Sequence, residues 1–177
     1  FLTGSPGASD YALSVAASVD SGNTAPSLTV LEPASVAGRL VAGTAVFGNV
    51  PPPNGTIGTL AYASPPDACE TISNGSAVAG KIALIDRGTC AFVEKVKRAQ
   101  DAGALGVVVA NNAAGVLNMG GTDATVTIPS VIVSLSDGNR IKSVLSGGVT
   151  VALFPGTDTL ASFSSRGPRR ESVPAGP

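Results

Sequence analysis

The sequence predicts a mixed α/β domain in which short strands and a few helices enclose an aliphatic core. The chain of 177 residues contains 22 glycines and 13 prolines, a frequency typical of closely spaced turns. Hydrophobic residues make up 44% of the chain but aromatic residues only 4%, so the core must be built from aliphatic side chains. In the second half, all-apolar runs alternate with segments of helical periodicity, which indicates buried strands connected by helices.

The first half of the chain predicts a small antiparallel sheet. Short β-branched stretches follow one another there and are separated by glycine and proline clusters, the sharpest of which is Pro51–Gly55. The expected strands are Leu28–Leu31, Arg39–Val41, Thr44–Phe47 and Ile57–Leu60. Further strands are expected in the flanks, at 10–20 and 160–168, and the tail 169–177 is expected to be disordered.

The segment from residue 81 to residue 110 predicts a strand, a helix and a second strand. Lys81–Ile85 and Leu105–Ala110 are apolar runs, and Ala91–Ala102 between them has helical periodicity. The helix is expected to bury Phe92, Val96 and Ala99. Its basic stretch, Lys95-Val-Lys-Arg98, is expected to form the exposed face, and Gly103 suits the position just after the helix.

A similar pattern follows from residue 126 to residue 154. Val126–Val133 is expected to be a strand, and the short helix after it is expected to be capped by Ser134 or Ser136. That helix ends at the two glycines 147–148 and leads into the strand Val149–Phe154.

The charge balance and the absence of histidine exclude several classes of function. The chain has 12 acidic and 11 basic residues, whereas a nucleic-acid partner requires a strongly basic surface. It contains 0 histidines, so it cannot assemble a Ser-His-Asp triad, a Cys-His dyad or a His-ligated metal. No apolar run approaches the ~20 residues that span a bilayer, so no membrane partner is expected. We therefore assign no catalytic residue, no metal ligand and no cofactor.

The two cysteines, Cys69 and Cys90, predict a disulfide in an oxidising compartment and hence an extracellular protein. Closing this loop would contribute about 3 kcal/mol in the chain-entropy model. The competing interpretation is a reactive thiol at Cys90, which precedes the predicted helix, where thiolates are stabilised. Because no histidine is present to act as a base, the disulfide is the favoured interpretation.

The run Gly75–Lys81 matches G-x-x-x-x-G-K, the core of a phosphate-binding loop. Such a loop must follow a strand and open a helix. Here Lys81 opens a predicted strand, and Ile82 stands where a magnesium-binding Ser or Thr is required. The match therefore predicts no nucleotide site.

The stretch from Gly80 to Asn111 closely resembles the protease-associated (PA) domain. The resemblance rests on an R-G-x-C-x-F element at Arg87–Phe92, followed by a helix that ends at Ala-Gly-Ala, and on Ile128–Ser134 with the Asp137-Gly138 helix. It covers roughly residues 27–155, and we assign the PA domain to residues 27–157. It implies a swivelling β/β/α architecture, with a small β-sheet or barrel core flanked by two short helices, and a non-catalytic role.

The flanks, residues 1–26 and 158–177, resemble core strands of subtilisin-like (S8) proteases. Gly4–Gly7 with Ala12–Asp20 is similar to the stretch after the oxyanion asparagine, and Leu160–Pro168 is similar to the next strand and turn. The first flank ends in a linker, and the tail after Pro168 departs from the family pattern. The resemblance implies a PA domain inserted in a secreted serine endopeptidase, whose triad lies outside this fragment.

The resemblance implies that the domain binds protein substrate or controls its access to the active site, while the fragment itself is not an enzyme. The expected contact residues are Arg87, Gly88, Thr89 and Phe92, although Arg87 and Gly88 could also serve only as the strand-to-helix turn. The expected partners are a protein or peptide substrate and the parent catalytic domain. The alternative is a structural or dimerisation module without substrate contact, for which a homodimer is the expected assembly.

Overall fold

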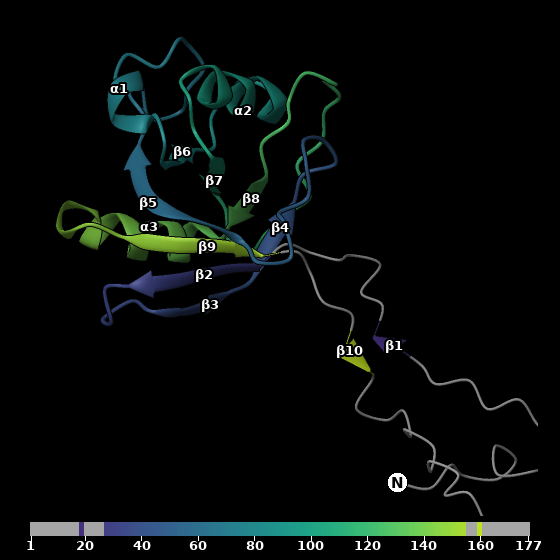
Figure 1. Ribbon diagram of the computed structural model, residues 1–177, viewed down its shortest axis with the longest axis vertical. Coiled ribbons are helices and arrows are strands. Elements are labelled where there is room, and N and C mark those ends of the chain that lie inside the picture. The colour runs from purple at the N-terminus through teal and green to yellow at the C-terminus, as the bar shows by residue number, and fades with distance from the viewer. Residues whose placement is uncertain (1–17, 20–26, 155–158, 161–177) are drawn as a thin grey trace, which may run out of the picture. The chain divides into compact units, whose positions relative to one another are not determined.

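The computed structural model describes residues 18–19, 27–154 and 159–160 (Figure 1). The chain divides into two units, Ala25–Gly156 and the pair of flanking segments. In the flanks, β1 (Ser18–Val19) pairs antiparallel with β10 (Thr159–Leu160). The rest of the strands predicted at 10–20 and 160–168, and the predicted tail, lie outside the described residues.

The unit Ala25–Gly156 is built on one eight-stranded sheet with three helices, which confirms the mixed α/β fold class. The strand order is β3-β2-β9-β5-β6-β7-β8-β4; β5 to β8 run parallel, and the remaining pairs are antiparallel. The strands are β2 (Ser27–Glu32), β3 (Gly38–Leu40), β4 (Ala42–Thr44), β5 (Thr56–Tyr62), β6 (Ile82–Asp86), β7 (Gly106–Ala110), β8 (Ser130–Val133) and β9 (Thr150–Phe154). The helices are α1 (Gly75–Val78), α2 (Phe92–Asp101) and α3 (Leu135–Val144), and a 3₁₀ turn, Leu145–Gly147, follows α3.

The sheet curls so that its two edges meet. β3 and β4 are the edge strands, yet only Val41 separates them along the chain. Because consecutive Cα atoms are 3.8 Å apart, the end of β3 and the start of β4 lie within about 8 Å of each other. This curling produces the barrel-like core that was predicted.

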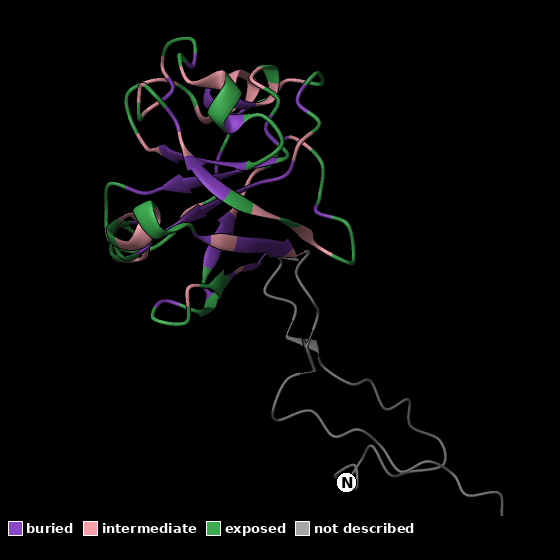
Figure 2. Ribbon diagram, turned by 60° about the vertical axis from the view of Figure 1, so that its left-hand side comes forward, coloured by how far each residue is buried: buried purple, intermediate pink, exposed green. Residues whose placement is uncertain are grey.

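Two apolar cores lie on opposite faces of the parallel strands, as expected for strands that are buried on both sides. In β6, Ile82 and Leu84 face the first core, which α3 covers with Ile141. Ala83 and Ile85 face the second core, under α1 and α2. Figure 2 shows buried residues along most of the strands and exposed residues mainly in the loops and helices.

The predicted helix at 91–102 forms as α2, and its end matches the prediction. Glu94 and Arg98 form an ion pair at 3.5 Å, one helical turn apart. Gly103 has a φ of +85°, the left-handed conformation that ends a helix at low steric cost. In α3, the Ser134 side chain accepts a hydrogen bond from the Asp137 amide at 3.1 Å, so Ser134 is the cap.

Two predicted strands have different bounds in the structure. Of the strand predicted at Val126–Val133, only Ser130–Val133 pairs, because Pro129 has no N–H to donate to the ladder. The strand predicted at Thr44–Phe47 lies earlier, at Ala42–Thr44. The pairing of β4 with β8 ends at Thr44, whose carbonyl accepts a hydrogen bond from the Met119 amide at 2.7 Å.

Two further features were not anticipated from the sequence. The segment Gly75–Val78 forms the short helix α1; Lys81 directly precedes β6, so the phosphate-loop geometry is not formed, as the sequence predicted. After α3 the chain enters the antiparallel part of the sheet, where β9 lies between β2 and β5 and pairs antiparallel with both. The second strand–helix–strand segment is therefore not a parallel crossover like the first.

Candidate functional site

The loop Arg87–Phe92 connects β6 to α2 at the carboxyl ends of the parallel strands. In α/β proteins, the loops that follow the carboxyl ends of parallel strands commonly bind ligands. The Arg87 amide donates to the Ala110 carbonyl at 2.8 Å, and its Nη1 donates to Asn111 Oδ1 at 2.9 Å. The guanidinium carbon lies 5.6 Å from the centre of the Phe92 ring. Arg87 is therefore half-buried and held between the end of β7 and the first turn of α2.

Asn111 is a site residue to which the sequence analysis assigned no role. Its side chain is buried, and its Oδ1 also accepts from the Asn112 amide at 2.9 Å. Its Nδ2 donates to the Gly115 carbonyl at 3.0 Å. The one available signal was its position, a polar residue directly after the all-apolar strand β7. Asn111 thus orients Arg87 and the following loop together.

Gly88, Thr89 and Ala91 are the exposed residues of the loop. A Cβ on Gly88 would lie 2.9 Å from Asp67 Cβ and 3.2 Å from Lys95 Nζ. Because Gly88 does not adopt a left-handed φ, it is required here by the close approach of Asp67 and Lys95. The Thr89 hydroxyl lies 4.0 Å from Cys69 Sγ.

Cys69 and Cys90 form the predicted disulfide, with their Cα atoms 5.6 Å apart. The bond joins the segment after β5 to the start of α2. The alternative of a free thiol at Cys90 is therefore wrong for this structure. The disulfide holds the loop Arg87–Phe92 against the segment Asp67–Cys69.

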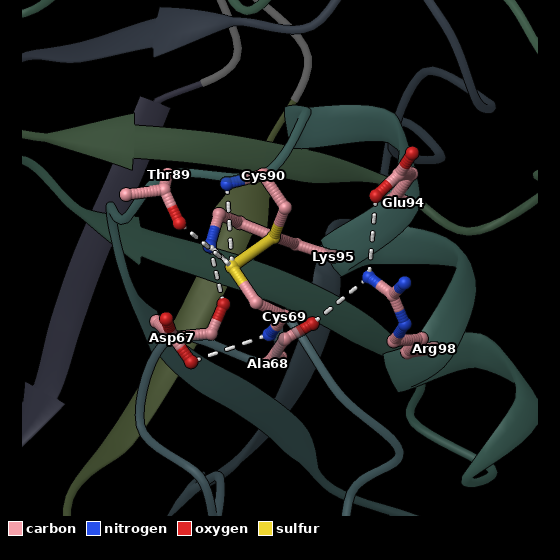
Figure 3. A network of polar contacts seen from close by, with 8 residues as sticks. All are labelled: Asp67, Ala68, Cys69, Thr89, Cys90, Glu94, Lys95 and Arg98. Carbon is pink, nitrogen blue, oxygen red and sulfur yellow. Dashed lines mark hydrogen bonds and ion pairs between the residues drawn. A yellow bond between two sulfur atoms is a disulfide. The ribbon is translucent and has the colours of Figure 1, made fainter.

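Lys95 is buried, and the prediction that it lies on an exposed helix face is wrong. Its side chain is 0% exposed, and its Nζ donates to the Asp67 carbonyl and, at 3.2 Å, to Cys69 Sγ (Figure 3). Burial lowers the pKa of Lys95, and the negative charge of Asp67 acts in the opposite direction. Helical periodicity predicts an exposed position for a lysine, because it depends only on neighbours in the helix. It cannot show that the Asp67 carbonyl, from a distant loop, lies within reach of Lys95.

Arg98 also faces the segment Asp67–Cys69. Its Nη1 donates to the Ala68 carbonyl at 3.2 Å and pairs with Glu94 (Figure 3). Lys97 instead pairs with Asp101 on the exposed side of α2. Two of the three basic residues of this helix therefore bind the neighbouring loop.

A second polar cluster lies where β5 and β6 end. The Tyr62 hydroxyl donates to Asp86 Oδ2 at 2.5 Å, and Lys142 Nζ from α3 lies 3.1 Å from Asp86 Oδ1. Partial burial, and then the hydrogen bond and charge of Asp86, raise the pKa of Tyr62. The cluster fastens α3 to the edge of the sheet, next to Arg87.

The described residues contain no group of three side chains from His, Cys, Asp and Glu that could hold a metal ion. Within the same part of the chain, no helix is long and apolar enough to cross a membrane. The polar side chains at the edge of the sheet are largely paired with one another. The arrangement therefore presents an exposed loop on a fixed support.

The fold and site define a small α/β module with a loop fastened at the carboxyl edge of its sheet. The sequence model of the PA domain family matches residues 56–141, from β5 into α3. This segment of the chain is a PA domain.

Two curated proteins illustrate the similarity. The minor extracellular protease Vpr of Bacillus subtilis is 39% identical over 102 residues, which is 53% of this chain and 12% of Vpr. The ER degradation-enhancing alpha-mannosidase-like protein 3 of Xenopus laevis is 38% identical over 97 residues, 49% of this chain and 11% of that protein. The chain thus spans about an eighth or less of the length of these relatives.

Among solved structures, an aminopeptidase from Aneurinibacillus sp. strain AM-1 has a similar fold. The TM-score is 0.59 at 23% identity, and the match covers 78% of this chain and 32% of that one. At this identity the likeness shows the fold alone.

Proposed function

We propose that residues 27–157 are a non-catalytic substrate-binding module of a secreted, subtilisin-like serine endopeptidase. In this role the module binds unfolded polypeptide, or controls its access to the active site, through Arg87, Gly88, Thr89 and Phe92. The observation that carries the proposal is the construction of the loop, which is exposed at Gly88 and Thr89 but fastened from both sides.

The fastening favours binding because it lowers the entropy that the loop loses on contact with a ligand. The disulfide fixes Cys90, and Asn111 with Phe92 fixes Arg87. The exposed positions between them offer a hydroxyl and free backbone to an extended chain. A domain tethered beside an active site also has a high effective concentration there, so weak contacts suffice to bias which substrates arrive.

The relatives support a non-catalytic role. The named chemistry of Vpr is that of a protease, whereas the Xenopus protein is named as mannosidase-like, yet both share this segment. A segment common to proteins of such different chemistry is best explained by a function other than catalysis. The absence of histidine from the chain agrees with this.

The parent type and the compartment rest on separate support. Vpr is named as an extracellular protease, and the flanks 1–26 and 158–177 resemble subtilisin-like core strands. The disulfide requires an oxidising compartment, in agreement with secretion.

The test is the binding of reduced, alkylated casein to the 177-residue chain, measured by biolayer interferometry. Thr89→Arg places a long charged side chain on the loop, and Ser146→Arg makes the same change at an exposed position after α3. We expect Thr89→Arg to weaken binding about tenfold or more and Ser146→Arg to leave it unchanged. Equal binding by both variants would remove the loop from the proposal.

Two further measurements separate the alternatives. A chain that is dimeric by light scattering and does not bind casein would support the structural or dimerisation role instead. Hydrolysis of a peptide by the purified chain would contradict the non-catalytic assignment.

A further inference from the structure

The two sulfur atoms of the disulfide have unequal surroundings. Cys69 Sγ accepts from Lys95 Nζ at 3.2 Å and from the Cys90 amide at 3.3 Å, and the Thr89 hydroxyl lies 4.0 Å away. All three contacts converge on the same sulfur in Figure 3. Among the described residues, no polar contact of this kind reaches Cys90 Sγ.

We propose that Cys90 Sγ is a thiol-modification site, attacked by an incoming thiolate, and that Cys69 departs as a thiolate paired with Lys95. In this step the thiolate sulfur forms a bond to Cys90 Sγ, and the bond between the two cysteines breaks. The electron pair of that bond goes to Cys69 Sγ, so the negative charge passes from the reagent to Cys69. The product is a mixed disulfide at Cys90.

The charge of Lys95 sets this direction. In thiol–disulfide exchange, the sulfur whose thiol has the lower pKa leaves faster. A neighbouring lysine lowers a thiol pKa, and here the ammonium is buried, where its interaction with a thiolate is screened little by water. A thiolate at Cys69 would in turn favour the charged form of Lys95.

The competing effect is the N-terminus of α2, which follows Cys90 and would stabilise a thiolate there. A helix terminus carries roughly half a unit charge, which is less than the full charge of Lys95. In addition, the Cys90 amide at this terminus already donates to Cys69 Sγ. Lys95 and the Cys90 amide therefore stabilise a thiolate at Cys69, and together they outweigh the effect of the helix N-terminus on a thiolate at Cys90.

The two cysteines are both half-buried, and each has an exposed neighbour in the chain, Glu70 beside Cys69 and Thr89 beside Cys90. The direction of attack therefore rests on the contacts that Cys69 Sγ makes with Lys95 and with the Cys90 amide. A dithiol reductant would complete the reaction. Its second thiolate attacks the reductant sulfur that is bonded to Cys90, and Cys90 leaves as a thiolate. The dithiol is then oxidised to a disulfide, and both cysteines are reduced. Opening the bond would free the loop Arg87–Phe92 from the segment Asp67–Cys69.

The first test uses the wild-type 177-residue chain and glutathione. After a short exposure, the reaction is quenched with acid, free thiols are alkylated, and both cysteine peptides are quantified by mass spectrometry. We expect glutathione on Cys90 and the alkyl group on Cys69, in about tenfold excess over the reverse product. An equal distribution, or a preference for Cys69, would overturn the proposal.

The second test measures the role of Lys95. Lys95→Met should slow the opening by glutathione and reduce the preference for Cys90. Lys97→Met, which removes a charge from the exposed side of the same helix, should change neither. An unchanged preference in Lys95→Met would contradict the assigned role of the lysine.

A third measurement does not depend on replacing a buried side chain. In Cys90→Ser the thiol of Cys69 should be alkylated at lower pH than the thiol of Cys90 in Cys69→Ser. The reverse order of thiol acidity would contradict the proposal. Neither this test nor the glutathione mapping involves substrate binding, so both can succeed or fail independently of the proposed function.

Discussion

The steric role of Gly88 gives a sharp test of how the loop is built. A Cβ at this position would lie 2.9 Å from Asp67 Cβ, 3.0 Å from Asp67 Oδ2 and 3.2 Å from Lys95 Nζ. Asp67 Cβ is attached directly to the backbone, and the Asp67 carbonyl accepts from Lys95. Relief of the overlap in Gly88→Ala would therefore move the segment that fastens Lys95 and Cys69.

The magnitude follows from two opposing effects. Overpacking of this kind costs about 1–3 kcal/mol. Replacing glycine by alanine also restricts the unfolded chain, which stabilises by about 0.4–1 kcal/mol. We therefore expect Gly88→Ala to lower the free energy of unfolding by about 1–2 kcal/mol.

Urea unfolding of the oxidised chain at neutral pH, followed by circular dichroism, measures this difference. Gly120→Ala is the matched control, because no atom lies within 4 Å of the added Cβ and Gly120 has no left-handed φ. The control should be neutral or slightly more stable than wild type. If Gly88→Ala is as stable as Gly120→Ala, the glycine is not required by the approach of Asp67 and Lys95, and the reasoning is refuted.

Two further predictions concern α3 and the edge of the sheet. Gly138→Ala should destabilise the chain by about 1–2 kcal/mol despite the better helix propensity of alanine, because the added Cβ would lie 2.7 Å from Ala110 Cβ. Gly147→Ala is the control: its added Cβ meets no atom within 4 Å, so it should be neutral or stabilising in the same urea assay. Tyr62 keeps its proton to higher pH in the folded state than in the unfolded chain, so its stabilising contribution is present below about pH 10 and is lost as the pH rises further. Wild type should therefore lose stability more steeply than Tyr62→Phe between about pH 9 and about pH 11, and parallel curves would contradict the assignment.

The elements that sequence patterns predicted well are those with strong local signals. β6, α2 and β7 lie close to their expected positions, because buried runs and helical periodicity depend on neighbours in sequence. The strand ends at Pro129 and Thr44 were predicted less well, since they depend on which distant segment completes the hydrogen bonds.

The site shows the same division. The disulfide could be predicted from the two cysteines, and the motif Arg87–Phe92 was found through its resemblance to the PA domain family. The burial of Lys95 and the role of Asn111 could not, because their partners lie in other segments of the chain.

From the amino-acid order alone follow the mixed α/β class, the lack of a histidine-dependent active site and the two cysteines available for a bond. These depend on composition and on short-range periodicity. The folded chain alone decides that Gly88 is needed for a close approach and that a helix lysine turns inward to Cys69. Such contacts depend on the distance between atoms far apart in sequence, and only packing brings those atoms together.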